Sequence, residues 1–348
     1  MIMIPRTAVA IIALAGPIAV AHSANADPVE NFYKGKTVYL IVGFAAGGGA
    51  DLWGRFLARH LGNFIPGKPN VIVQNMTGAS GFAAINHVYN VGPHDGTRLI
   101  APTVSAPTAK ALGLPNVRWD TLKFQWLGNL VKDAPACVAS GRSGIKSITE
   151  AKNREIIFGS DGASNSTSGH PKTLAALLGY KVKVITGYSG TSQVRLAMDK
   201  GEVDAVCSFW ASSALGPQRS DMDSGALVPI VQMGETKYPI FGNAPTAYSL
   251  ARNQEELQVM RFVFGPSEIS RPVGVSPGVP ADRVAALRKA FWEAANSAEM
   301  KADADKMGLV IGPVGWQETE AELRKLLDVP PSVVQRAKMA LGLNEKKK

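Results

Sequence analysis

The stretch TVYLIVGFAAGGGAD, residues 37–51, decides the fold. Its first six residues form an apolar run rich in β-branched side chains, which predicts a buried strand. Three consecutive glycines follow, and residues 50–60 then repeat apolar side chains at the spacing of an amphipathic helix. A strand that runs through glycines into a helix presents backbone N–H groups at the positive end of the helix dipole. We therefore expect an α/β unit whose first loop (residues 43–49) binds an anion.

The alternation of strands and helices recurs along the chain in two blocks. In the first block, strands at residues 70–75 and 98–103 flank a helix at residues 82–89. The second block has strands at residues 155–160, 181–188, 203–209 and 226–233, with helices at residues 171–179 and 192–200. Because strands that alternate with helices form parallel βαβ units, the pattern predicts two α/β lobes.

Two further segments connect these blocks. Residues 123–140 have an extended pattern, and a capping box follows, with Ser147 as N-cap and Glu150 three residues later. After the second block, the strand-like residues 271–277 lead into a tail of helical composition. We expect this tail to pack back on the first lobe.

The N-terminus has the pattern of an export signal. Residues 1–26 contain the basic Arg6, an apolar stretch at residues 8–20 and the small-residue sequence Ala24-Asn25-Ala26. This pattern predicts a secretory signal that is cleaved before Asp27, with a retained membrane anchor as the alternative. The chain that remains is long enough for two domains of about 100–200 residues each.

Composition limits the classes of partner. The chain is 46% hydrophobic, which is typical of a packed soluble protein, and its net charge is +9. A basic exported protein meets anionic small molecules or anionic surfaces. Nucleic acid is not expected as a partner, because export removes it and the basic residues do not cluster with aromatic residues.

The known motifs of nucleotide binding and catalysis are absent from the sequence. The first loop lacks the Lys-Ser/Thr of a phosphate-binding loop. Its glycine spacing fits a dinucleotide loop, yet none of the seven tyrosines is followed four residues later by lysine. The five histidines form no H-E-x-x-H motif, and no G-x-S-x-G motif occurs. We therefore predict no catalytic residues, no metal site and no cofactor. A tight turn that holds no ligand remains the alternative for the first loop.

A second loop (residues 159–170) also follows a strand and precedes a helix. It is rich in serine, threonine and asparagine, whose side chains can cap a helix or donate to carboxylate oxygens. An ordinary capped turn is the alternative, although the loop is longer and more polar than capping requires. One such loop in each lobe predicts a cleft that closes on a ligand from both sides.

The order and spacing of several segments resemble a known family. They are YKGKTVYLIVGFAAGGGADLWGRFLARHL, VIVQNMTGASGFAAINHVYNVGPHDGTRL, GYSGTSQVRLAMDKGEVDAV and GVPADRVAALRKAF. Together with the export signal, they resemble the solute-binding receptors of tripartite tricarboxylate transporters, called Bug receptors. The resemblance extends from about residue 32 to about residue 341.

The resemblance implies a fold and its domain boundaries. The fold is a type II periplasmic binding protein, or Venus flytrap, with two α/β lobes, two crossing strands and C-terminal helices that pack on lobe 1. The boundaries that we expect are residues 1–26 for the signal, 27–133 for the first part of lobe 1, 134–265 for lobe 2 and 266–348 for the return to lobe 1.

The family's first loop has the pattern F-x-P-G-G-x-x-D, and this chain matches it except for Ala46 in place of proline. We expect Gly47, Gly48 and Gly49 to donate N–H groups, and Asp51 to brace the loop, since two negative charges repel. The family's lobe-2 pattern of serine, glycines and histidine appears with additional serine and asparagine. The ligand contacts predicted in this way are Phe44, Ala46, Gly47, Gly48, Gly49, Asp51, Thr103, Ser105, Ser164, Asn165, Ser166, Thr167, Ser168, Tyr188, Ser208 and Phe209. Trp210 is a further candidate for the cleft, whereas Trp53 is expected in the core.

The implied fold suggests whether the two cysteines can pair. On it, Cys137 lies on the first crossing strand and Cys207 lies on the neighbouring strand of lobe 2. A disulfide within lobe 2 then becomes possible, because adjacent strands are about 5 Å apart. Two unpaired thiols are the alternative.

The function that the resemblance implies is periplasmic capture of a small carboxylate for the membrane permease subunits of a transporter. We expect a monomer that performs no covalent chemistry. A sensor subunit for a signalling protein is one alternative, and a secreted α/β hydrolase is another.

Overall fold

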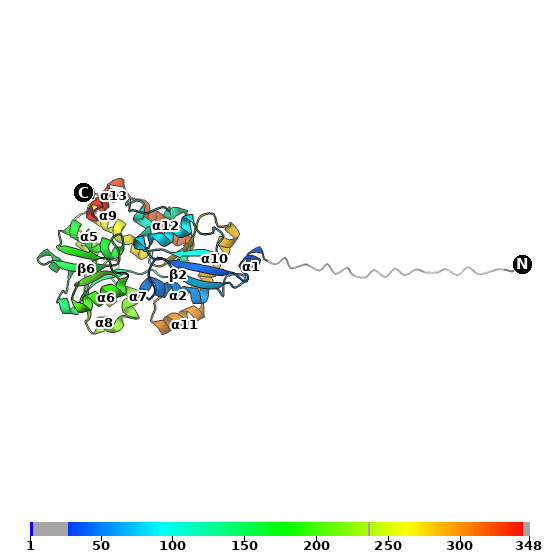
Figure 1. Cartoon of the computed structure of the whole chain (residues 1–348), viewed down its shortest axis with the longest axis horizontal. Helices are drawn as coiled ribbons and strands as arrows, with labels where there is room; N and C mark the ends of the chain where they lie inside the picture. The colour runs from blue at the N-terminus through cyan, green and yellow to red at the C-terminus, as the bar shows by residue number, and fades with distance from the viewer. Residues whose placement is uncertain (3–26, 236, 344–348) are drawn as a thin grey trace.

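The computed structural model describes residues 1–2, 27–235 and 237–343, so the predicted export signal lies outside the described residues. Two sheets stand side by side, each covered by helices on both faces (Figure 1). Among the described residues, no helix has the length and apolar character needed to cross a membrane.

The first sheet belongs to lobe 1 and has the strand order β11-β4-β10-β3-β1-β2. Its strands are β1 (Thr37–Val42), β2 (Asn70–Asn75), β3 (Arg98–Ala101), β4 (Gln125–Asn129), β10 (Pro272–Val275) and β11 (Val314–Gly315). β1 is parallel to β2 and β3, while β10 is antiparallel to β3 and β4. The predicted apolar run at residues 37–42 is thus the centre of a βαβ unit.

The second sheet belongs to lobe 2 and has the strand order β7-β6-β8-β5-β9. Its strands are β5 (Pro135–Ser140), β6 (Ile156–Ser160), β7 (Val182–Thr186), β8 (Ala205–Trp210) and β9 (Leu227–Gln232). β6 is parallel to β7 and β8, and β5 is antiparallel to β8 and β9. The exits of β6 and β8 therefore lie at one edge of this sheet.

The chain passes between the sheets after β4 and again before β10. The two crossing segments are tied to each other, since the backbone N–H of Arg271 donates to Asn129 Oδ1 and the backbone N–H of Leu130 donates to the Arg271 carbonyl. Ser270 Oγ adds a hydrogen bond to the Val131 carbonyl. These contacts make the crossing segments one hinge.

The helices cover both sheets. They are α1 (Pro28–Tyr33), α2 (Gly49–Leu61), α3 (Phe82–Asn90), α4 (Ala106–Ala109), α5 (Ser166–Leu178), α6 (Thr191–Lys200), α7 (Ala211–Leu215), α8 (Arg219–Asp223), α9 (Gln254–Phe264), α10 (Ala281–Asn296), α11 (Ala298–Met307), α12 (Trp316–Leu327) and α13 (Pro331–Ala340). Leu40, Phe56 and Phe291 belong to one core on the α2 and α10 side of the lobe-1 sheet. A second, larger core continues from lobe 1 into lobe 2.

The last helix differs from the expectation that the whole tail returns to lobe 1. α10 and α12 pack on β4 of lobe 1, but α13 packs on α5 and α9 of lobe 2 (Figure 1). The prolines at positions 330 and 331 explain the change of direction, because proline cannot extend a helix yet suits the start of the next one. α13 then buries Val333 and Ala337 against lobe 2.

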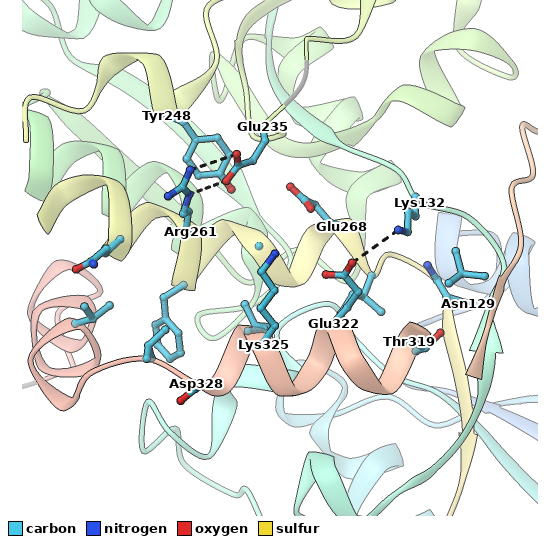
Figure 2. Close-up of a pocket in the computed structure, with 18 of the residues that line it drawn as sticks. Asn129, Lys132, Glu235, Tyr248, Arg261, Glu268, Thr319, Glu322, Lys325 and Asp328 are labelled. Atoms are coloured by element: carbon cyan, nitrogen blue, oxygen red, sulfur yellow. Dashed lines mark hydrogen bonds and ion pairs between the residues drawn. The ribbon is translucent and has the colours of Figure 1, made fainter. Parts of the chain in front are cut away.

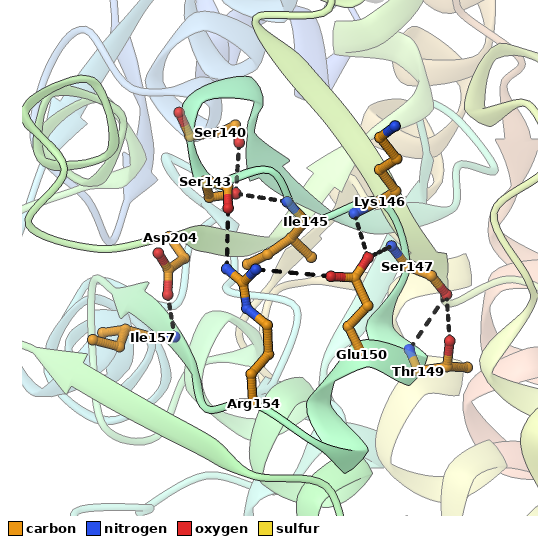
Figure 3. A network of polar contacts seen from close by, with 10 residues as sticks. All are labelled: Ser140, Ser143, Ile145, Lys146, Ser147, Thr149, Glu150, Arg154, Ile157 and Asp204. Atoms are coloured by element: carbon orange, nitrogen blue, oxygen red, sulfur yellow. Dashed lines mark hydrogen bonds and ion pairs between the residues drawn. The ribbon is translucent and has the colours of Figure 1, made fainter.

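The predicted capping box is present at the start of a 3₁₀ helix, Ile148–Lys152 (Figure 3). The Ser147 side chain accepts from a backbone N–H of the first turn, and Glu150 accepts from the Ser147 N–H. Arg154 joins this turn to the Ser143 carbonyl. The network fixes the connection between β5 and β6.

A disulfide joins Cys137 of β5 to Cys207 of β8, and both residues are fully buried. The two strands pair antiparallel, with an irregularity between Ala136 and Val138. The bond therefore links the first strand after the hinge to the strand whose exit carries Ser208.

Candidate functional site

The exits of β1 and β3 in lobe 1 face the exits of β6 and β8 in lobe 2. Thr103, which follows β3, is buried and places its Oγ1 3.5 Å from Asn165 Oδ1 of lobe 2. Close beside this contact, a Cβ added to Gly162 would lie 2.6 Å from Ser80 Oγ of lobe 1. The predicted loops of the two lobes thus meet in one cleft.

The first loop is held from beneath by Asp51. The residue is 3% exposed, and its carboxylate accepts hydrogen bonds from the Gly47 N–H, Arg55 Nε and Asn75 Nδ2, each at 2.9 Å. Burial alone raises the pKa of Asp51, but the hydrogen bonds from Arg55, Gly47 and Asn75 outweigh it and hold the pKa below its ordinary value. Asp51 therefore braces the loop, as expected. The Gly47 N–H was expected to donate to the ligand, but in the structure it donates to Asp51.

A neighbouring loop contributes residues that sequence reasoning did not include in the site. The segment TGASG, residues 77–81, follows β2 and touches the first loop backbone to backbone. A Cβ on Gly43 would lie 2.7 Å from the Gly81 Cα, and the Phe44 ring would lie 3.6 Å from a Cβ on Gly81. Ser80 has a positive φ of 59°, which is uncommon outside glycine. Because this segment follows a strand that is parallel to β1, the sequence could have indicated that it lies beside the first loop.

The second loop is held by hydroxyl and amide side chains. Asp161 accepts from Asn165 Nδ2 at 3.0 Å and from Thr167 Oγ1 at 2.6 Å. Thr167 also lies 2.8 Å from Ser160 Oγ, and Ser168 is fully buried. Thr167 and Ser168 therefore support the loop from inside instead of facing the cleft as expected. Ser164 and Ser166 stay partly exposed, and Asn165 is buried against Thr103 of lobe 1.

The helix after the second loop begins earlier than the sequence indicated. α5 starts at Ser166, so Pro171 lies inside the helix and not at its first turn. A proline this near the N-terminus removes only one intrahelical hydrogen bond. The earlier start brings the N–H groups of the first turn to the cleft.

Ser208 and Phe209, at the end of β8, face opposite sides of their sheet. Ser208 Oγ donates to Ser166 Oγ at 2.8 Å, and its φ of 64° marks a strained backbone of the kind found at functional sites. Phe209 instead packs in the lobe-2 core against Phe241, which differs from its predicted contact with the ligand. Tyr188 is half-buried beside Gly159, at the exit of β6.

Four of the predicted residues share one cavity. Ser105 of lobe 1 and Ser164, Asn165 and Ser166 of lobe 2 line a space of about 40 Å³. This space is large enough for ordered water and too small for an organic dicarboxylate. The buried His170 also lines it, and burial lowers the pKa of this residue to about 3.

Three helices begin just after strands that end on the cleft side of their sheets: α2 follows β1, α5 follows β6 and α6 follows β7. The N-cap residues of α2, α5 and α6 are Gly48, Asn165 and Gly190, and within the described part of the chain none of them makes a side-chain capping hydrogen bond. The N–H groups of a first turn have no partner inside the helix. An anion that accepts these hydrogen bonds would gain both donors and a favourable dipole.

One arginine lies at the hinge beside the cleft. The Arg271 guanidinium is 4.7 Å from the ring centroid of Trp210 in lobe 2 and 5.6 Å from that of Trp53 in lobe 1. Sequence reasoning placed Trp53 in the core, where it lies with 3% exposure, but it did not identify Arg271. This residue is far in sequence from both loops, so only the fold reveals its position.

A second cavity of about 290 Å³ lies on another side of the hinge, between α9 and α12 (Figure 2). Arg261 pairs with Glu235 at 2.6 Å, and Lys132 lies 3.8 Å from Glu322. Burial, with the nearby charge of Glu235, raises the pKa of Glu268. Charged side chains of both signs line this pocket, while the two loops of the cleft offer hydroxyl, amide and backbone donors.

Comparisons with known proteins agree with this architecture. No family model matches the sequence. The chain is 26% identical over 283 residues to the UPF0065 protein in the gbd 5′ region of Cupriavidus necator, which covers 79% of this chain and 80% of that protein. It is 33% identical over 120 residues to Protein BugT of Bordetella pertussis, which covers 34% of this chain and 36% of BugT.

Solved structures extend the similarity to the fold. The periplasmic binding protein BugD superposes with a TM-score of 0.68 at 19% identity, covering 88% of this chain and 98% of BugD. R. palustris Rpa4515 with adipate superposes with a TM-score of 0.67 at 17% identity, covering 87% of this chain and 97% of Rpa4515. MatC of Rhodopseudomonas palustris with bound malate superposes with a TM-score of 0.63 at 18% identity, covering 86% of this chain and 99% of MatC. The chain therefore has the two-lobed α/β fold of periplasmic binding proteins.

Proposed function

The chain is a relative of the Bug receptors, and from this premise we propose that it is a periplasmic solute-binding protein for a small carboxylate. The observation that carries the proposal is that α2 and α5, whose N-caps make no side-chain capping hydrogen bond, begin at loops that meet between the two lobes. Such termini bind anions through backbone donors and the helix dipole.

The surrounding side chains suit a carboxylate better than a phosphate-rich ligand. The hydroxyl and amide groups of Thr103, Ser105, Asn165 and Ser166 can each donate to a carboxylate oxygen. The strand-exit loops offer no lysine, in contrast to phosphate-binding loops. The adipate bound to Rpa4515 and the malate bound to MatC support this choice of ligand class.

We assign the ligand contacts as follows. In lobe 1, the N–H groups of Gly48 and Gly49 donate to the carboxylate, and the Phe44 ring covers its apolar part. In lobe 2, Ser164, Asn165, Ser166 and Ser208 hold the other side, with Tyr188 at the rim. Ala46 replaces the proline of the family pattern and leaves the first loop less rigid. No residue is assigned to a covalent step.

We further propose that the mature chain begins at Asp27 after export, acts as a monomer and delivers its ligand to membrane permease subunits. Two boundaries of lobe 2 support the proposed domains, since the chain crosses between the sheets after β4 and before β10. Under this proposal lobe 2 comprises residues 134–265, and α13 lies on it as an added helix from the C-terminal segment.

A thermal-shift panel of mono-, di- and tricarboxylates tests the proposal. Ligand that binds only the folded state at one hundred times its Kd stabilises that state by about 2.7 kcal/mol, which raises Tm by roughly 5 °C for a chain of this size. Each acid is compared with its amide, which has the same shape without the charge. No shift with any carboxylate, or equal shifts with the amides, would overturn the proposal.

A further inference from the structure

Arg271 occupies a position that joins both lobes and the hinge. It precedes β10 on the second crossing segment, and its backbone N–H donates to Asn129 Oδ1 at the end of β4, 2.8 Å away. Its guanidinium lies against one tryptophan ring from each lobe, Trp53 of α2 and Trp210 at the end of β8. Trp53 follows Gly49 by one helical turn, and Trp210 follows Ser208 by two residues. The guanidinium is therefore next to both sides of the cleft.

One edge of the guanidinium is uncommitted. Nη1 donates to the Ser270 carbonyl at 2.9 Å. Nε is buried and has no hydrogen-bond partner within the part of the chain that the structure describes, although the residue as a whole is partly exposed. A buried N–H that lacks a partner has lost its hydrogen bonds to water without replacement, which destabilises the fold. Such groups are rare in native structures unless a ligand, ion or water serves them.

Asp133, the carboxylate whose charge acts on Arg271, does not hydrogen-bond to this edge. Asp133, on the first crossing segment, is buried and accepts hydrogen bonds from the backbone N–H and the hydroxyl of Ser212 and from the Ala134 N–H. Burial lowers the pKa of Arg271 to about 10, and the charge of Asp133 opposes this change, so Arg271 remains a cation at neutral pH. Asp133 thus balances the charge while Nε stays open.

The chemistry of the open edge selects its partner. The guanidinium is a planar fork whose N–H groups match the two oxygens of a carboxylate, and charge-assisted hydrogen bonds of this kind are short and strong. We propose that Arg271 anchors the bound ligand, with its Nε edge donating to a ligand carboxylate. The inference rests on the proposed function and adds a charged contact to a cleft otherwise built from neutral donors.

The test compares Arg271→Gln and Arg271→Lys with the wild-type protein by isothermal titration calorimetry, using adipate, malate and adipamide as probes. Loss of a charge-assisted hydrogen bond predicts an affinity about 30-fold weaker for Arg271→Gln. Arg271→Lys keeps the positive charge but loses the planar guanidinium, so we expect its affinity for the dicarboxylates to lie between those of wild type and Arg271→Gln. Adipamide should bind wild type and Arg271→Gln with similarly low affinity.

Arg288→Gln is the matched control. Arg288 also stacks on a tryptophan, 3.6 Å from the Trp316 ring, and it pairs with Glu320, but it lies on α10 away from the cleft. We expect its affinity for the probes to stay within twofold of wild type. Circular dichroism and Tm establish that each variant is folded.

A measurement on the wild-type fold covers the case in which Arg271→Gln does not fold. In protein labelled with ¹⁵N, the arginine Nε–H resonance that disappears in Arg271→Lys should shift when adipate or malate binds. Binding by Arg271→Gln within threefold of wild type, or an Nε–H resonance that does not move, overturns the anchor and leaves the proposed function standing. A wild-type protein that binds no carboxylate in the thermal-shift panel overturns both.

Discussion

The first and second loops perform the same task with different chemistry. In lobe 1, glycines allow two strand exits to touch backbone to backbone, and the nearly buried Asp51 holds the loop through three donors. In lobe 2, the less buried Asp161 holds the loop through two side chains, Asn165 and Thr167. In both cases an aspartate accepts hydrogen bonds from groups of its own loop. The comparison teaches that an acidic residue in an anion-binding loop can be part of the support.

The helices that begin at the two loops each contain a buried histidine, and the two histidines have different neighbours. His60, on α2, is buried with Nε2 2.8 Å from Asp303 Oδ2. His170, on α5, packs its ring against Phe264 with a centroid distance of 5.0 Å, and its Nδ1 has no hydrogen-bond partner among the described residues. His60 Nδ1 likewise has no hydrogen-bond partner among the described residues, so the histidines differ in the partner of one nitrogen only, and lobe 2 adds a covalent bond.

Removing the disulfide should have the largest effect and should weaken lobe 2 alone. The bond closes a segment with a sequence separation of 70 residues, for which chain entropy predicts a loss of about 4 kcal/mol in the free energy of unfolding. The Cys137→Ser/Cys207→Ser variant tests this by urea denaturation. Hydrogen exchange should show faster opening in β5 and β8 than in β1 and β3. Two alkylation adducts on unreduced, denatured wild-type protein would contradict the bond itself.

Breaking each brace compares the two loops directly. Asp51→Ala removes an acceptor from three groups and should cost about 3 kcal/mol, with Arg55 adding little because half of it is exposed. Asp161→Ala removes hydrogen bonds from two neutral donors to a partly exposed carboxylate and should cost about 1 kcal/mol. Equal losses in urea denaturation would show that burial of the brace does not matter.

The lowered pKa of Asp51 adds a check on pH. Its contribution is present above the ordinary aspartate pKa and is lost as the pH falls through the lower folded pKa. The difference in stability between wild type and Asp51→Ala should therefore shrink in acid.

The unpaired His170 gives lobe 2 a sensitivity to pH. Its folded pKa of about 3 lies below the ordinary value of 6.5, so the unfolded chain binds a proton that the folded chain rejects. Stability from this residue is present above pH 6.5 and is lost as the pH falls toward 3, by roughly 2 kcal/mol between pH 7 and pH 5. His170→Gln should remove this part of the slope. An unchanged difference between wild type and variant across these pH values would contradict it.

The sequence predicted the parts of this molecule that depend on local pattern. The apolar run at residues 37–42, the glycines after it and the capping box at Ser147 are each decided by neighbouring residues, and the structure places them as expected. The resemblance to a family supplied the two-lobed order, which single loops could not establish.

The rest depends on contacts between residues far apart in the chain. The commitment of the Gly47 N–H follows from the position of Asp51, which Asn75 fixes from 24 residues away. The role of Arg271 depends on Asn129, 142 residues earlier, and on a tryptophan from each lobe. The direction of α13 depends on an apolar face that fits lobe 2. No local pattern distinguishes these outcomes from their alternatives.

The smallest effect should come from the contact that joins the two loops. Thr103 Oγ1 and Asn165 Oδ1 are 3.5 Å apart, which is long for a hydrogen bond, so Thr103→Val should change the affinity for a carboxylate by about twofold, or roughly 0.5 kcal/mol. Thr173→Val is the matched control, because Thr173 is fully buried on α5 and its hydroxyl lacks a partner in the described chain. Removing that hydroxyl should leave affinity unchanged and keep or raise stability. A loss of affinity above tenfold in Thr103→Val would mean that this hydroxyl contacts the ligand itself, and that lobe 1 also uses a side-chain donor.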